Sequence, residues 1–179
     1  TLLNVLTQQR QDLGNGDGSA FFYSLDQSGQ WQIEAQLQDE AGNRATVTSN
    51  VFLIDNTAPS AHLDPQGDET WHTQPVAVEV SPYDEHSGVK RWRWALSVDG
   101  GLHYGRCSEW LQAQPATLTL GENGLNRIKV EVEDFAGNRS VTLSDLYKID
   151  RLPPQSERSW IEDEAGTILA DGDQVYSNW

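Results

Sequence analysis

The stretch Asp39-Glu40-Ala41-Gly42-Asn43-Arg44 returns as Asp134-Phe135-Ala136-Gly137-Asn138-Arg139, 95 positions further along the chain. The match extends outward without a gap, so that residues 29–59 align with residues 124–154. A period of this length exceeds the roughly 20–50 residues of solenoid repeats and fits a complete small domain. We therefore expect a chain built from repeated modules.

The boundaries of the modules follow from the period. Fewer than two periods fit into 179 residues, and residues 67–71 find a second match in residues 172–176. We therefore interpret the chain as a piece of a longer array. The expected domains are the C-terminal part of one module at residues 1–57, a complete module at 58–151 and the N-terminal part of a third at 152–179.

Apolar residues alternate with polar ones along most of the complete module. Examples are Val76-Ala77-Val78-Glu79-Val80 and Ile128-Lys129-Val130-Glu131-Val132, and this period of two predicts strands with one buried face. Asp99-Gly100-Gly101 predicts a tight hairpin turn, and only residues 1–12 come near a helical period. The pattern predicts an all-β sandwich. The expected strands lie near residues 68–72, 75–81, 89–98, 102–107, 115–120, 127–134 and 140–150.

Asp-x-Ala-Gly-Asn, followed about ten residues later by Ile-Asp-x-x-x-Pro, resembles the repeats of bacterial immunoglobulin-like domains. These domains occur in very large surface adhesins and other secreted bacterial proteins, and Asp84–Val89 resembles the middle of the same repeat. The resemblance implies tandem immunoglobulin-like antiparallel β-sandwiches in an extracellular protein, secreted or on the bacterial cell surface. Neighbouring domains of the same chain are the implied partners. The sequence names no host-cell, surface or glycan ligand.

The resemblance also implies a calcium site at the joint between modules, because some relatives are thought to bind calcium there. In an immunoglobulin-like sandwich, two of the loops between strands lie at the end where the chain enters. Calcium binds six to eight carboxylate, amide, carbonyl or water oxygens. The alternative is structural: Asp39 and Asp134 accept turn amides, and Asp55 ends a strand. The candidate ligands are Asp55, Asn56, Asp84, Glu85, Asp134 and Asn138.

Charge and composition exclude several partners. The chain carries 27 acidic and 12 basic residues, for a net charge of −15. This charge repels nucleic acid and attracts divalent cations, although acidity also keeps a surface protein soluble. The single cysteine, Cys107, excludes a disulfide framework. No run of 18 apolar residues occurs in the sequence, so we expect no membrane insertion.

Seven tryptophans are a high count for this chain. Trp92 and Trp94 share one strand face, and we expect them to fill the core. The alternative is an exposed strip, together with Trp110 or Trp71, that stacks on sugar rings. Arg91 and Arg93 on the opposite strand face are expected to be solvated.

The chain carries no pattern typical of an enzyme. His103 and Cys107 lack a nucleophile elbow and a third partner. We therefore expect a non-catalytic stalk or spacer of an adhesin-like protein, stiffened by calcium between domains. Two alternatives stay open. One is a carbohydrate-binding accessory module of a secreted enzyme, and the other is a filament subunit whose chains share strands between residues 152–179 and 1–57.

Overall fold

The computed structural model describes residues 1–16, 22–154, 160–162 and 168–171. These residues form strands and no helix, which confirms the all-β prediction, and none of them builds a helix that could cross a membrane. The strands are β1 (Leu2–Asn4), β2 (Arg10–Gln11), β3 (Gly29–Gln38), β4 (Arg44–Thr48), β5 (Phe52–Ile54), β6 (Ser60–Asp64), β7 (Trp71–His72), β8 (Val76–Tyr83), β9 (Val89–Ser97), β10 (Ala116–Leu120), β11 (Gly124–Asp134), β12 (Arg139–Leu143), β13 (Tyr147–Ile149), β14 (Trp160–Glu162) and β15 (Ile168–Asp171).

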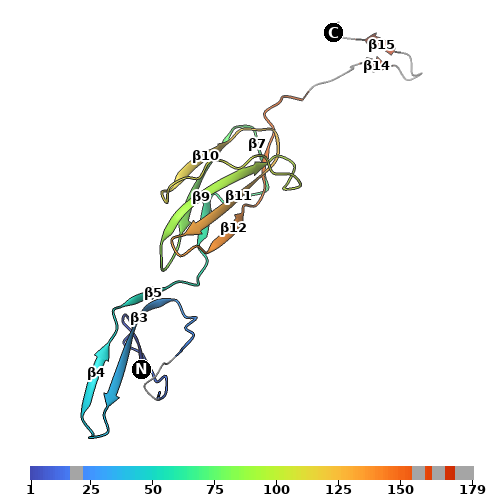
Figure 1. The fold of residues 1–179 in the computed structure, drawn as a ribbon. Helices are drawn as coiled ribbons and strands as arrows, with labels where there is room; N and C mark the ends of the chain where they lie inside the picture. The colour runs from blue at the N-terminus through green and yellow to red at the C-terminus, as the bar shows by residue number, and fades with distance from the viewer. Residues whose placement is uncertain (17–21, 155–159, 163–167, 172–179) are drawn as a thin grey trace.

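Residues 60–149 form two sheets that pack face to face (Figure 1). One sheet has the antiparallel order β10-β8-β6. In the other, β11 pairs with β9 along one edge and with β12 and then β13 along the opposite edge, while β7 adds to β13 in parallel. This arrangement is that of a β-sandwich.

The core lies between these two sheets because each strand turns its alternate apolar residues inward. β8 contributes Val78 and Val80, which are fully buried and pack against buried residues of β11. Trp92 is also fully buried, and its indole Nε1 donates to the Gln114 carbonyl oxygen over 3.2 Å. Trp94 packs against the same core. The prediction that these tryptophans fill the core is confirmed for Trp92, which excludes a sugar-binding strip that includes it, whereas Trp94 is only partly buried at the margin of the core.

Strands β1 to β5 form a single sheet at the other end of the linker Asp55–Pro59 (Figure 1). Its pairing repeats that of the sandwich. Leu2 faces Ile33 as Leu96 faces Ile128, and β4 and β5 follow one another along β3 as β12 and β13 do along β11. The sequence repeat is therefore also a repeat of strand register.

The strands differ from those expected at four places. Residues 68–72 are extended only at β7, and β6, where no strand was expected, precedes them. Alternation of Ala61 and Leu63, both turned toward the core, was the signal for β6. No strand occurs at residues 102–107, although the Gly105 amide donates to Leu96. The strand expected at 140–150 is broken because Ser144 uses its hydroxyl to bond the Ile128 amide.

The described residues near both ends of the chain also form strands. Residues 1–12, which come nearest to a helical period, form β1 and β2 instead. β14 pairs with β15 in antiparallel orientation. The match between residues 67–71 and 172–176 lies outside the described residues.

Candidate metal centre

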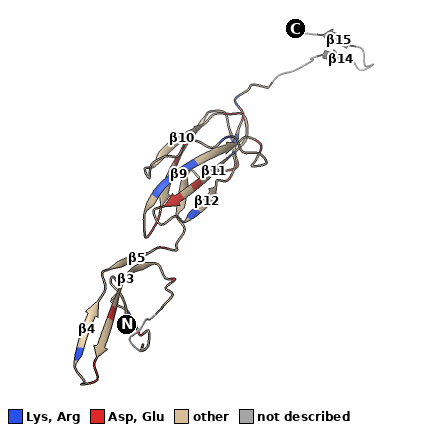
Figure 2. Ribbon diagram, in the orientation of Figure 1, with Lys and Arg blue, Asp and Glu red and all other residues tan. Residues whose placement is uncertain are grey.

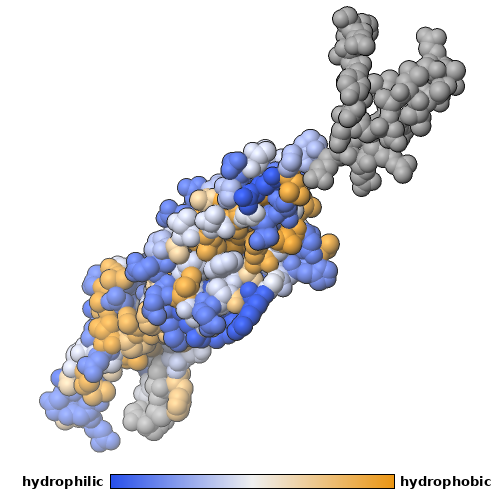
Figure 3. All heavy atoms as spheres, turned by 90° about the horizontal axis from the view of Figure 1, so that it is seen from above, coloured by the Kyte–Doolittle hydropathy of each residue, from blue (hydrophilic) through white to orange (hydrophobic). Residues whose placement is uncertain are grey.

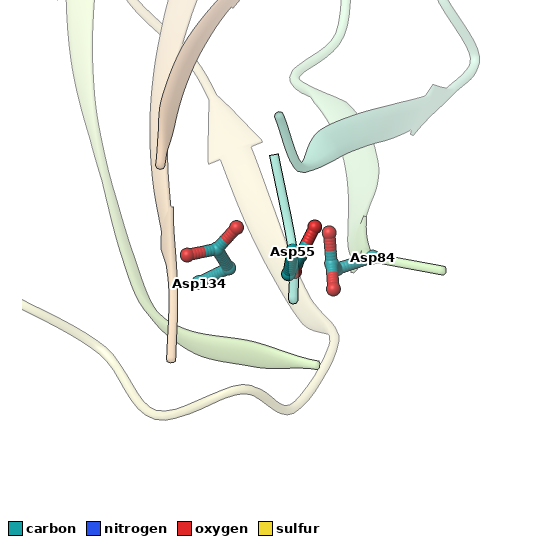
Figure 4. A group of neighbouring side chains, drawn as sticks. All are labelled: Asp55, Asp84 and Asp134. Carbon is teal, nitrogen blue, oxygen red and sulfur yellow. The ribbon is translucent and has the colours of Figure 1, made fainter. Parts of the chain in front are cut away.

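Three aspartates from three separate elements meet where the linker joins the sandwich. Asp55 follows β5 at the start of the linker, Asp84 follows β8, and Asp134 ends β11. β8 and β11 belong to opposite sheets but end at the same end of the sandwich, where β6 begins. One carboxylate oxygen of each aspartate lies within 4.8 Å of the others, and Figure 4 shows Asp55 between Asp134 and Asp84.

Backbone amides hold each of these carboxylates in place. Asp55 accepts from the amide of Thr57 over 2.9 Å and from that of Ser87 over 3.0 Å. Asp84 Oδ1 accepts from Gly88 over 2.7 Å and from His86 over 3.2 Å. Amide donors orient a carboxylate without adding a countercharge. The loops therefore fix the positions of the carboxylates and leave their charge available to a cation.

Asp84 Oδ2 is a buried oxygen that no hydrogen-bond donor of the described residues reaches. A buried acceptor without a partner costs about 1–3 kcal/mol, and more when it is charged. An ordered water, or a cation held among the three carboxylates, would satisfy such an atom.

Asn138 ties the β11–β12 turn to the linker. Its Nδ2 donates to the linker carbonyl oxygens of Asp55 over 3.0 Å and Thr57 over 3.2 Å, and to Asp134 Oδ2 over 2.8 Å. Asp134 is fully buried and accepts two turn amides through Oδ1. The structure thus places Asn138 beside the cluster as a donor that positions the linker.

The cluster is electrostatically unfavourable by itself. At an effective dielectric constant near 20, two like charges about 5 Å apart repel by roughly 3 kcal/mol. Burial raises the pKa of Asp55, but hydrogen bonds from Ser87 and Thr57 outweigh that effect and hold the pKa below its usual value. Asp55 is therefore ionised at neutral pH. Among the described residues, no Lys, Arg or His forms an ion pair with the three aspartates.

The dimensions and chemistry suit calcium. Calcium–oxygen distances are about 2.3–2.6 Å, so two ligands on opposite sides of one ion are at most about 5 Å apart. The observed limit of 4.8 Å lies within this range. Hard carboxylate oxygens without nitrogen or sulfur ligands favour calcium over zinc or copper.

Two of the six candidate ligands do not join the cluster. The Asn56 side chain donates to the Asp26 carbonyl oxygen over 2.7 Å, and its amide bonds Ser28, so it belongs to the N-terminal sheet. Glu85 is exposed and is not among the converging carboxylates. Asn56 directly follows Asp55, and Glu85 directly follows Asp84. Because neighbouring side chains point in different directions, neither side chain faces the cluster.

The contributions of Ser87 and Thr57 were not expected. Ser87 donates its amide to Asp55, and its hydroxyl accepts from the Ala136 amide over 3.3 Å, so it links the two loops. Thr57 presents its carbonyl oxygen to Asn138. Thr57 acts through a backbone group, which every residue carries, so its residue type held no signal, whereas Ser87 acts through both its amide and its hydroxyl.

The outer face of the larger sheet offers little as a ligand site. Figure 2 shows basic residues on β9 and β12 beside acidic residues on β11. Arg93 pairs with Glu131 over 2.6 Å and stacks on Trp110 at 4.5 Å from the ring centre. Arg91 stacks on the same ring at 4.2 Å. These arginines are therefore paired rather than merely solvated, and the adjoining cleft of about 190 Å³ is smaller than typical ligand pockets.

Neither the protein-family models nor the curated proteins compared with this chain gave a match.

Proposed function

We propose that the chain is part of a tandem array of immunoglobulin-like sandwiches that serves as a non-catalytic, extracellular stalk or spacer of an adhesin-like bacterial protein. Calcium bound by Asp55, Asp84 and Asp134 stiffens the joint between residues 1–57 and 58–151. One observation carries the proposal: a linker carboxylate lies within 4.8 Å of carboxylates from two sandwich loops.

The immunoglobulin-like assignment is supported by the strand pairing. A three-stranded sheet faces a sheet built around β11, and β7 joins the last strand in parallel. The first strand of such a domain crosses from one sheet to the other in this way, here as β6 and then β7. The fold alone does not specify function, and the feature that favours a stalk is the joint.

The joint is supported as a stiffening device by where its ligands come from. Asp55 belongs to the linker, so an ion that also binds Asp84 and Asp134 ties the linker to the sandwich. Asn138 adds hydrogen bonds to two linker carbonyl groups. Pro59 restricts the backbone immediately before β6. A short linker held at so many points transmits orientation from one module to the next.

Thermal unfolding with calcium and with a chelator tests the metal. At calcium a hundredfold above Kd, binding to the native state alone adds about 2.7 kcal/mol, which raises Tm by roughly 10 °C. We expect this shift with calcium and a smaller one with magnesium, which demands a stricter octahedral geometry. Equal Tm values in calcium and in chelator contradict the proposal.

Asp84→Asn makes the test specific. The variant keeps Oδ1 as the acceptor for Gly88 and His86 and places an amide nitrogen where Oδ2 has no partner. We expect Tm in chelator to rise, because one negative charge is gone, and the calcium shift to disappear. The matched control Glu85→Gln removes one charge from the neighbouring exposed position and should keep the calcium shift. A calcium shift that survives Asp84→Asn overturns the assigned site.

A further inference from the structure

Two Asn-Gly pairs occur in this chain, Asn15-Gly16 and Asn123-Gly124. In such a pair the backbone nitrogen of the glycine attacks the side-chain amide carbon of the asparagine, because glycine has no Cβ to block the approach. The attack closes a succinimide ring and requires the backbone between the two residues to rotate. The sequence makes both pairs equal candidates for this reaction, and only their surroundings distinguish them.

Asn15-Gly16 lies in the connection between β2 and β3, outside every strand. Both residues are exposed. Gly14 precedes them with a φ of 88°, and nothing beyond its chain neighbours lies within 4 Å of where its Cβ would be. Among the described residues, no hydrogen bond holds the Asn15 side chain or the Gly16 amide. Nothing in this part of the structure therefore prevents the backbone from reaching the geometry of ring closure.

The same connection buries little apolar surface where the structure describes it. Phe22 and Tyr23, which lead into β3, are 92% and 47% exposed. Figure 3 shows hydrophobic side chains on the surface of the N-terminal part of the molecule. Gln11 Nε2 donates to the Tyr23 hydroxyl over 2.8 Å, which ties the ends of the connection and leaves Asn15 between them. Segments with few buried contacts open most readily, so the Asn15 backbone moves at low cost.

Asn123-Gly124, in contrast, is held at both residues. Asn123 Oδ1 accepts from the Arg151 amide over 3.0 Å. Gly124 begins β11 opposite Ile149, and a Cβ at this glycine would lie 2.5 Å from the Val98 carbonyl oxygen. To reach the Asn123 amide carbon, the Gly124 nitrogen would have to break the Arg151 bond and leave the strand. The fold therefore protects this pair.

We propose that Asn15 is a site of spontaneous chemical modification, with Gly16 as the nucleophile. The Gly16 backbone nitrogen bonds to Asn15 Cγ, and the side-chain amide nitrogen leaves as ammonia together with the Gly16 amide proton. Water then adds to one of the two ring carbonyl carbons and opens the ring, which gives aspartate or isoaspartate. Either product adds one negative charge, and isoaspartate also adds a carbon atom to the backbone. The site is independent of the metal and of the proposed stalk.

Incubation of the full chain in neutral buffer, with peptide mass spectrometry over time, tests the proposal. We expect Asn15 to convert at least tenfold faster than Asn123, with isoaspartate detected by enzymatic methylation. Equal conversion of the two residues, faster conversion of Asn123, or no conversion of Asn15 overturns the inference. In denaturing urea the two pairs should convert at similar rates, and a tenfold difference that persists there contradicts protection by the fold.

Gly16→Val tests the nucleophile, with Asn123 as the internal reference. A β-branched side chain hinders the backbone nitrogen, so conversion at Asn15 should fall at least tenfold. Direct hydrolysis of the side chain by water does not depend on the next residue, so unchanged conversion overturns ring closure. Leu13→Val is the matched control, because it places the same side chain before Asn15 and should leave the conversion rate unchanged. Equal slowing by both variants contradicts the role of Gly16.

Discussion

Two serines close equivalent breaks in the last strand of each unit. Ser144 Oγ accepts the Ile128 amide over 2.9 Å and donates to the Asp145 carbonyl oxygen over 2.7 Å. Ser49 makes the same two bonds with Ile33 and Asn50. At each break, the last strand no longer offers a backbone acceptor to the amide of the central strand, which is Ile128 in β11 and Ile33 in β3. The serine hydroxyl accepts from that amide instead, which explains why a serine occurs at both positions.

Ser144→Ala should therefore lower the free energy of unfolding by about 1–3 kcal/mol, because it leaves a buried amide unpaired. Ser140→Ala is the control, since the Ser140 hydroxyl is buried without a hydrogen-bond partner and its removal should cost almost nothing. Urea unfolding of both variants gives the comparison. If both variants lose the same free energy of unfolding, the effect comes from the lost side-chain volume and not from the lost hydrogen bond.

Gly124 holds a position that no side chain fits. Its φ is 129°, and a Cβ there would lie 2.5 Å from the Val98 carbonyl oxygen. We expect Gly124→Ala to cost about 3 kcal/mol through strain and overpacking together. Gly137→Ala, at φ 97° with open space around the new Cβ, isolates the strain at about 1 kcal/mol. Urea unfolding in chelator measures both, and equal costs refute the clash.

Tyr147 gives a pH dependence of defined sign. Burial, reinforced by Asp145 and Asp68, raises its pKa to about 12, and its hydroxyl donates to the Pro65 carbonyl oxygen. Because the folded state favours the neutral phenol, this contribution is complete below pH 10 and is lost as pH rises toward 12. Tyrosinate absorbance should show one late transition that Tyr147→Phe removes and Tyr83→Phe, at an exposed ring, retains.

At the scale of elements, β3 and β11 carry the same alternation in different surroundings. Both present apolar residues at every second position, and both pair with a broken last strand. β11 is buried on its inward face because a second sheet covers it, whereas the corresponding face of β3 is half exposed. β3 and β11 therefore share one sequence pattern but differ in burial.

Val132→Ala and Leu37→Ala, at equivalent positions, should differ in cost. The first creates a cavity in a close-packed core and should lower unfolding free energy by about 2 kcal/mol. The second removes a half-exposed side chain and should cost less than about 1 kcal/mol. Hydrogen exchange of β11 and β3 amides reports each unit separately. Equal costs indicate that the half-exposed face of β3 is covered in solution.

At the scale of the whole molecule, the linker joint connects the two units. Asp55 and Asn138 bond the linker to both loops at the sandwich end, and repulsion within the acidic cluster opposes this closure. Under the proposed function, a bound cation removes this repulsion, so the joint is stiff with metal and looser without it.

Backbone NMR relaxation tests this difference. With calcium, residues 29–54 and 60–149 should report one common rotational diffusion tensor, and in chelator they should report two. Asp84→Asn should behave as two units under both conditions, while Glu85→Gln should follow the unmodified chain. Identical relaxation with calcium and with chelator contradicts a metal-dependent joint.

The sequence by itself determined the repeat, the all-β class and most of the central strands, because alternation and turn chemistry depend on neighbours along the chain, but it missed β6 and the break between β12 and β13. It also included Asp55, Asp84 and Asp134 among its candidate ligands, and two of these, Asp55 and Asp134, recur as Asp150 and Asp39. Only the tertiary structure decided that these three converge while Asn56 and Glu85 turn elsewhere, because side-chain direction depends on loop geometry. It alone decided that one apolar face is buried and its repeat is open, since burial requires a second sheet and no local pattern reports one.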